Sequence, residues 1–256
     1  MTGTIRRAAV AGVFYPSDGE GLRRTVESLL TEAPQGDGPP PKALVVPHAG
    51  YVYSGSVAAT AYARLRNAGD RIERVVLLGP AHYHPLQGLA THSADAFETP
   101  LGCVPVEHTR AVRVLDAAHQ REHSLETQLP FLQVALGAFH LVPIVVGEAA
   151  AEEVGAVTDA LWGGEETLVV VSTDLSHYHD ARTARKLDRA TADDIVALRA
   201  EALGSDSACG RHALAGLLVT LRNRGLRLEC IDLRNSADTA GDPDRVVGYG
   251  AFVSAR

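Results

Sequence analysis

The sequence has few cysteines, no excess of positive charge and no long apolar run, and each shortage excludes a class of protein. Its three cysteines, Cys103, Cys209 and Cys230, are odd in number and far apart, with no C-x-x-C pair. This spacing indicates neither a structural zinc site nor a disulfide framework. No stretch approaches the roughly 18–20 apolar residues of a membrane span. Reduced thiols and an N-terminus without a signal-like segment predict a cytoplasmic protein with no membrane partner.

The charge balance and several missing motifs narrow the function further. The formal net charge is −7, which disfavours nucleic acid as the main partner because phosphate binding requires a basic surface. There is no G-x-x-x-x-G-K-[ST] and no strand-linked G-x-G-x-x-G, so no nucleotide cofactor is predicted. The absence of G-x-S-x-G and H-E-x-x-H makes a serine hydrolase of the α/β-hydrolase type and a zincin protease poor candidates.

What the sequence does contain is an alternation of β-branched runs with helical patterns. The 256 residues are 46% hydrophobic and show no linker or repeat, so we predict a single domain over 1–256. Helices separating the strands indicate an α/β fold with a central, largely parallel or mixed sheet flanked by helices. Expected strands are 43–47, 74–79, 140–146, 167–172, 226–233 and 245–253, and expected helices are 55–66, 109–119, 125–136, 150–161, 182–201 and 207–224. Residues 86–108 are less regular and predict a hairpin or an excursion over the site.

Three of the apolar runs are each followed within a few residues by a histidine or an aspartate. His48 ends Ala-Leu-Val-Val-Pro-His, and His82 ends Val-Val-Leu-Leu-Gly-Pro-Ala-His. The third run, at 168–171, leads into Ser-Thr-Asp-Leu-Ser-His, which contains Asp174 and His177. Because the carboxyl ends of parallel strands lie together and form the ligand site of such sheets, these residues are expected to meet in one pocket. The pattern predicts a metal or acid–base site.

His48 and His82 are the best candidates for metal ligands, since two imidazoles on rigid strand ends can face a common centre. The alternative is that one or both cap a helix or bond within a turn. Asp174, three residues before His177, either orients that imidazole for proton transfer or caps the following helix. Glu122, His123 and Glu126 form a charged cluster that, taken alone, favours a surface turn. We expect six further histidines to be ordinary surface or core residues: His84, His92, His108, His119, His140 and His212.

Six segments in order along the chain resemble the Memo family, whose prokaryotic members are called AmmeMemoRadiSam system protein B. The likeness covers nearly the whole chain. The segments are Gly-Val-Phe-Tyr-Pro at 12–16, Pro-His-Ala-Gly-Tyr at 47–51, Leu-Gly-Pro-Ala-His at 78–82, Glu-His-Ser-Leu-Glu at 122–126, Ser-Thr-Asp-Leu-Ser-His at 172–177 and Cys-Gly-Arg-His at 209–212.

This resemblance implies a fold akin to the class III extradiol ring-cleaving dioxygenases, which use non-haem iron(II). By that analogy His48 and His82 are the metal ligands and His177 is the acid–base catalyst, with Asp174 and His123 lining the pocket. Copper and zinc are alternatives to Fe(II). In animal Memo proteins a cysteine completes the metal site, and Thr239 stands in its place here, although a hydroxyl is a much poorer ligand than a thiolate. The family name also implies a functional link to a radical-SAM enzyme.

Three functions follow as hypotheses. The first is a metal-dependent, dioxygenase-like oxidoreductase acting on a small aromatic or similar substrate. The second is a non-catalytic module that uses the same cleft for a peptide, a partner protein or a metal ion. The third and weaker one is a metal-assisted hydrolase in which His177 activates water.

Overall fold

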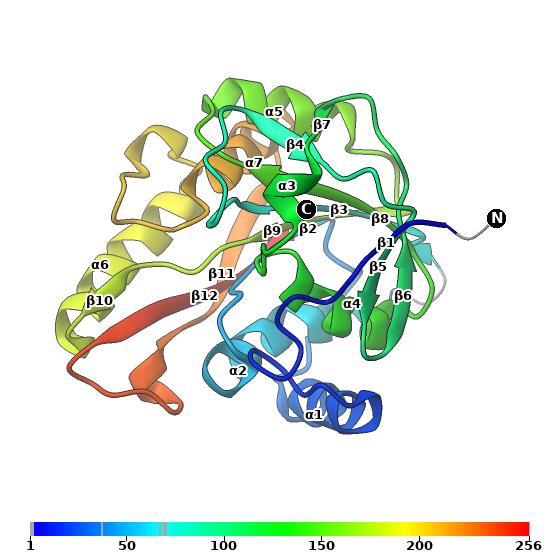
Figure 1. The fold of residues 1–256 in the computed structure, drawn as a ribbon. Coiled ribbons are helices and arrows are strands. Elements are labelled where there is room, and N and C mark those ends of the chain that lie inside the picture. The colour runs from blue at the N-terminus through cyan, green and yellow to red at the C-terminus, as the bar shows by residue number, and fades with distance from the viewer. Residues whose placement is uncertain (1–2, 37, 67, 69–70, 256) are drawn as a thin grey trace.

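A mixed β-sheet with helices on both faces forms the body of the computed structural model, which describes residues 3–36, 38–66, 68 and 71–255 (Figure 1). Within these residues the main sheet has nine strands, in the order β10-β12-β2-β9-β3-β8-β4-β7 with β11 paired to β12. The strands are β2 Ala43–Val46, β3 Arg74–Pro80, β4 Leu89–Thr91, β7 Arg113–Val114, β8 His140–Val146, β9 Thr167–Ser172, β10 His177–His179, β11 Arg227–Asn235 and β12 Val246–Ala255. The predicted α/β fold with a mixed, helix-flanked sheet is confirmed.

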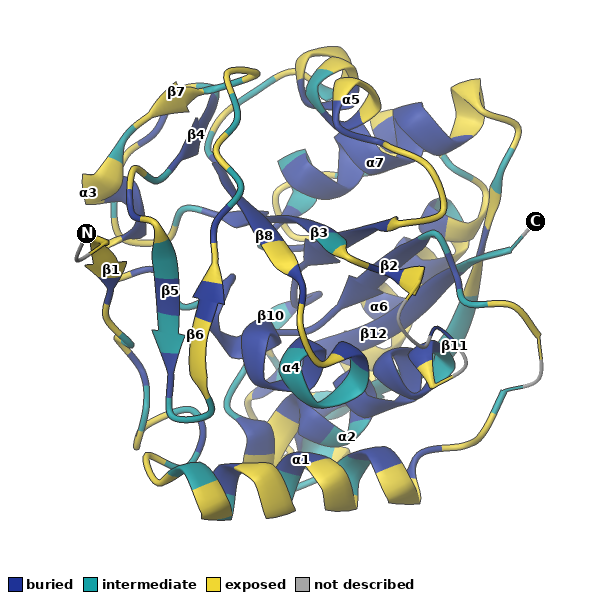
Figure 2. Cartoon of the chain, turned by 90° about the vertical axis from the view of Figure 1, so that its right-hand side faces the viewer, coloured by how far each residue is buried: buried dark blue, intermediate teal, exposed yellow. Residues whose placement is uncertain are grey.

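The two faces of this sheet bury separate sets of side chains, because successive residues of a strand point to opposite sides. In β2, Leu44 and Val46 pack under helices α1 (Gly19–Glu32), α2 (Tyr51–Tyr62) and α4 (Leu129–Leu136). Ala43 and Val45 face the other layer, which contains α5 (Ala151–Ala160), α6 (Ala181–Val196) and α7 (Arg211–Asn223). Figure 2 shows the strands as a buried layer between these helices. The near-continuous apolar runs of the sequence therefore reflect burial on both faces.

A second, three-stranded sheet lies beside the main one. It contains β1 (Ile5–Arg6), β5 (Ala96–Thr99) and β6 (Gly102–Pro105), in the order β1-β5-β6. The antiparallel pair β5–β6 is the hairpin predicted within 86–108. Short helices complete the described chain: α3 Asp116–His119 and 3-10 turns at Ala63–Leu65, Glu126–Gln128, Ala200–Ala202 and Ser236–Asp238.

The helix expected at 109–119 is wrong. Residues 113–114 instead form β7, which extends the edge strand β4 in parallel, and the Leu115 amide donates to the Thr91 carbonyl at 3.0 Å. Only residues 116–119 are helical. Pairing with an open sheet edge therefore prevails over the local helical pattern. In the part of the chain that the structure describes, no helix is both long and apolar enough to cross a membrane.

Candidate metal centre

Three parallel strands place the predicted site residues at one edge of the sheet. β9 lies between β2 and β3, with Val46 opposite Ser172 and Leu78 opposite Val171. His48, His82 and Asp174 each lie two residues beyond the end of their strand. The sheet register therefore brings together residues that are up to 126 positions apart in sequence.

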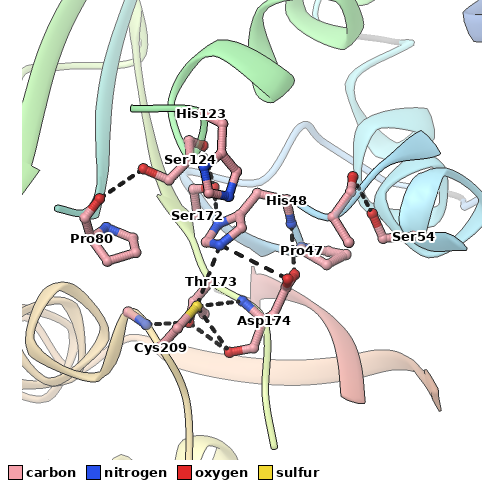
Figure 3. A network of polar contacts seen from close by, with 12 residues as sticks. Pro47, His48, Ser54, Pro80, His123, Ser124, Ser172, Thr173, Asp174 and Cys209 are labelled. Carbon is pink, nitrogen blue, oxygen red and sulfur yellow. Dashed lines mark hydrogen bonds and ion pairs between the residues drawn. The ribbon is translucent and has the colours of Figure 1, made fainter. Parts of the chain in front are cut away.

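Three imidazoles gather at this edge. One ring nitrogen from each of His48, His82 and His123 lies within 4.8 Å of the others, so the group can hold a metal ion. Ring centroids of His82 and His123 are 4.7 Å apart in a stacked arrangement, and His48 meets both rings edge-on. The side chains of His48, His123 and His82 are 2%, 12% and 27% exposed, so the group is open on the His82 side. Figure 3 shows His48 between His123 and Asp174.

A hydrogen-bond network fixes which nitrogen of His48 is free. The Ser172 hydroxyl donates its single hydrogen to the Ser124 carbonyl at 2.6 Å and accepts from the Gln128 amide at 2.8 Å. It also lies 2.9 Å from Nδ1 of His48, and since its hydrogen is already used, Nδ1 must be the donor. Nε2 of His48 therefore carries a lone pair, and this is the atom that faces the site.

Glu122 holds His82 in the same way. One carboxylate oxygen lies 2.9 Å from His82 Nδ1, and the other accepts the His82 backbone N–H at 2.6 Å. A carboxylate behind an imidazole fixes the ring and increases its basicity, as in carboxylate–histidine–metal sites. Glu122 is 2% exposed and also accepts the backbone N–H groups of His123 and Ser124.

The segment that carries Glu122 and His123 is buried, and the surface turn that its charges favoured is wrong. Gly79, near the end of β3, permits the close approach, because a Cβ there would meet the Ser124 hydroxyl oxygen at 2.8 Å. At the far end of the segment Glu126, 0% exposed, forms an ion pair with Arg6. Both carboxylates of the segment therefore have a partner far away in the sequence, His82 for Glu122 and Arg6 for Glu126.

Asp174 and His177 occupy different surroundings. Asp174 Oδ1 accepts the His48 backbone N–H at 2.8 Å, and Oδ2 lies 3.9 Å from His48 Nε2. Burial raises the pKa of Asp174, against the opposing effect of that hydrogen bond. His177 Nδ1 pairs with the Leu175 carbonyl at 2.8 Å, at the start of β10. The Asp174 carboxylate thus accepts hydrogen bonds from the backbone of His48 and Ala49, and its interaction with His177 is through charge.

Cys209 is a site residue that the sequence reasoning missed. Its Sγ lies 3.3 Å from His48 Nε2 and also hydrogen-bonds to the His82 imidazole. Thr239, which stands where the family cysteine was expected, instead shares its single hydroxyl hydrogen between the carbonyls of Tyr53 and Ser236, at 2.9 and 3.0 Å. The available signal was a Cys-Gly pair directly before an apolar helical pattern, a position where a helix N-terminus favours a thiolate.

The charges around this cluster perturb its pKa values. Burial opposes the protonated form of His82, but Cys209 and Glu122 outweigh it and raise the pKa of His82 to about 10. Burial would raise the pKa of Cys209, yet His48 and His82 lower it to about 6. Burial and the neighbouring His48 lower the pKa of His123 to about 3. A divalent metal would displace the proton of His82, so metal uptake is coupled to proton release.

Replacing Glu122 by glutamine is expected to weaken metal binding by about 10–100-fold, the range for loss of a group that orients a ligand imidazole. The amide keeps the size of the side chain but removes the charge opposite His82. Chelator competition with Zn(II) measures the change. Glu107→Gln is the control, because Glu107 is 44% exposed and pairs with Arg74, and it should bind Zn(II) as the wild type does. Equal affinities for both variants would contradict the role of Glu122.

Comparison with known proteins finds a family model and relatives that match nearly the whole chain. The family model described as Memo-like protein matches residues 6–253. A MEMO1 family protein of Methanopyrus kandleri is 38% identical, with 98% of this chain and 99% of the relative covered. A second, from Aquifex aeolicus, is 35% identical over 97% of this chain and 98% of its own length. The chain therefore belongs to the Memo family.

Proposed function

We propose that this protein is a metal-dependent oxidoreductase, with a mononuclear centre held by His48 and His82 and a small aromatic-like substrate beside it. The observation that carries the proposal is the pair of strand-end imidazoles, each with Nδ1 bonded away from the site. Such pre-orientation is what a ligand histidine requires, and a turn-capping histidine does not need it.

The donor set fits a divalent transition metal. Imidazole and thiol groups suit iron, copper and zinc, whereas magnesium and calcium prefer oxygen ligands. Nδ1 of His123 is buried and, among the described residues, has no hydrogen-bond partner, so this nitrogen is available to a bound group. Fe(II), our first choice, would supply the dioxygen chemistry that amino-acid side chains lack.

The surroundings of His123 support a flat, aromatic-like substrate. The rings of Phe14 and Tyr83 lie 4.8 and 5.7 Å from the His123 ring. Phe14 also lines an open cavity of about 740 Å³ between the N-terminal loop and α2, together with Tyr51 and Val52. A mostly apolar cavity beside a few polar groups is typical of small-molecule sites.

His177 is the proposed proton carrier. A carbonyl only accepts, so the contact with Leu175 places a hydrogen on Nδ1 of His177 and leaves Nε2 able to take a proton. Asp174 is close enough to His177 to interact with it electrostatically, and its carboxylate accepts the His48 backbone N–H.

His177→Asn is expected to keep one equivalent of metal and to lose turnover by about 10²–10⁴-fold, the usual contribution of general acid–base catalysis. Asparagine retains a polar side chain of similar reach but does not titrate. Metal analysis and steady-state rates measure the two effects separately. His179→Asn, two residues along the same strand, is the control. A His177→Asn protein with normal turnover would refute the assignment.

Oxygen consumption tests the reaction class. Protein loaded anaerobically with Fe(II) is expected to take up oxygen with a panel of catechols, without a hydrolytic product. Product formed without oxygen uptake would favour the metal-assisted hydrolase. An Fe(II)-loaded protein that consumes no oxygen with any catechol would contradict the oxygenase.

A binding module is the second candidate. Val13 and Val52 at the same cavity are 79% and 67% exposed, which is favourable for a peptide or partner protein. Absence of stoichiometric metal in the wild-type protein would favour this function over the enzyme. A cytoplasmic location and a link to a radical-SAM enzyme stay predictions.

A further inference from the structure

A cavity of about 710 Å³ lies at the end of the sheet opposite to the histidines. Lys42, which lines it, directly precedes β2, and Thr167 in its lining is the first residue of β9. His48 and Asp174 lie beyond the other ends of these two parallel strands. The cavity is therefore separate from the metal centre, and a ligand bound there does not depend on the metal.

Much of the cavity wall is apolar and already formed. Three consecutive prolines at 39–41 contribute one part of it, and their rings restrict the backbone there. Ile72 and Val253 add aliphatic surface, and Trp162, which is 6% exposed, adds an aromatic ring. A cavity of this volume with apolar walls and a few polar groups is typical of small-molecule sites.

Arg64 gives the cavity a cation without a partner. Its Nε is buried and has no hydrogen-bond partner in the part of the chain that the structure describes. The guanidinium lies against Gly36, where a Cβ would come within 1.6 Å of Nη1 of Arg64, so only glycine leaves it this space. A buried donor without an acceptor costs free energy, and an anion in the cavity would supply the acceptor.

Lys42 adds a second cation to the lining. Its Nζ donates to the carbonyls of Gly164 and Thr167 and lies 5.3 Å from the centroid of the Trp162 ring. An ammonium group has three hydrogens, so one is left for a ligand. Burial lowers the pKa of Lys42 to about 8, against the opposing charge of Glu166. An anion beside Lys42 would favour its protonated form.

The ionisable side chains of the lining leave a small positive excess. Three are cationic, Lys42, Arg64 and Arg71, and two are carboxylates, Glu165 and Glu229. This local excess contrasts with the formal net charge of −7 for the whole chain. It matches a ligand with one negative charge, whereas a polyphosphate would bring more charge than the lining balances.

We propose that this cavity binds a small amphipathic monoanion, an aromatic or aliphatic acid whose apolar body lies against Trp162 and whose acid group pairs with Arg64. The apolar walls account for the body of the ligand, and the two cations account for its single charge. The site is additional to the metal centre and requires no metal.

Trp162 reports binding directly, because it is the only tryptophan of the chain. The probe is anilinonaphthalene sulfonate, an aromatic monoanion that accepts excitation energy from tryptophan. The protein is expected to bind one equivalent with saturable quenching of the Trp162 emission. Octanoate is expected to displace the dye, whereas octanol, which has the same chain length without the charge, should be at least about tenfold less effective.

Arg64→Gln is expected to weaken dye binding by about tenfold or more, the usual effect of losing a hydrogen bond to a charged group. Glu229→Gln removes a carboxylate from the lining and is expected to strengthen binding. Arg110→Gln is the control, because Arg110 is exposed and lies outside the lining. If Arg64→Gln does not fold, the Glu229→Gln protein decides alone. Quenching that does not saturate, or equal affinities in these variants and the wild type, would overturn the proposal.

Discussion

Glu126→Ala is expected to lower the free energy of unfolding by about 3–5 kcal/mol, the cost of leaving one member of a buried ion pair without its partner. The Arg6 side chain is 4% exposed and would keep its charge in the protein interior. The carboxylate also accepts the backbone N–H groups of Ala9 and Val10 and the Tyr15 hydroxyl, at 2.8, 2.9 and 2.6 Å. Four groups of the N-terminal segment therefore converge on one buried carboxylate.

Urea unfolding of the metal-free protein measures the loss without a contribution from bound metal. Glu98→Ala is the matched control, because Glu98 pairs with Arg7 at the surface, where Arg7 is 74% exposed. Such a pair contributes about 0–1 kcal/mol. If the two variants unfolded at the same urea concentration, Glu126 would not be the structural anchor of this segment.

The double variant His48→Ala, His82→Ala is expected to reduce bound Fe(II) from about one equivalent to none. Ser172 holds the His48 imidazole in its orientation, and Glu122 holds that of His82. Alanine supplies no donor atom in either place. His123 and Cys209 would remain, and two donors without the strand-end pair do not complete a coordination sphere. Metal analysis after anaerobic gel filtration measures the loss.

His108→Ala, His140→Ala is the control for this experiment, since both residues are exposed and lie outside the cluster. That variant should retain one equivalent of Fe(II). Circular dichroism of both double variants excludes loss of fold as the cause. Retention of Fe(II) by the His48 and His82 variant would place the metal elsewhere.

The strand ends could be predicted because their signal is local. A short apolar run followed by Pro-His or Pro-Ala-His indicates a buried strand and a polar residue at its carboxyl end, and parallel pairing then brings such ends together. His48 and His82 meet for this reason. The predicted strands at 140–146 and 167–172 coincide with β8 and β9, since both are buried along nearly their whole length.

The residues that surround the histidines could not be predicted, because their roles depend on distant partners. Glu126 is a surface charge until Arg6, 120 residues away, is placed beside it. Cys209 is an isolated thiol until Gly210 packs against Thr173 at the end of β9. Asp174 was expected to orient the nearby His177, but its hydrogen bond goes to the His48 backbone in another strand end. Sequence spacing does not contain such contacts.

A crystal structure of the protein loaded anaerobically with Fe(II), with anomalous scattering recorded at the iron edge, tests the metal centre most directly. We expect one anomalous peak about 2.0–2.2 Å from Nε2 of both His48 and His82, as for a metal bound by imidazoles. An iron peak remote from His48 and His82, or no peak in fully loaded crystals, would contradict a metal centre at these strand ends.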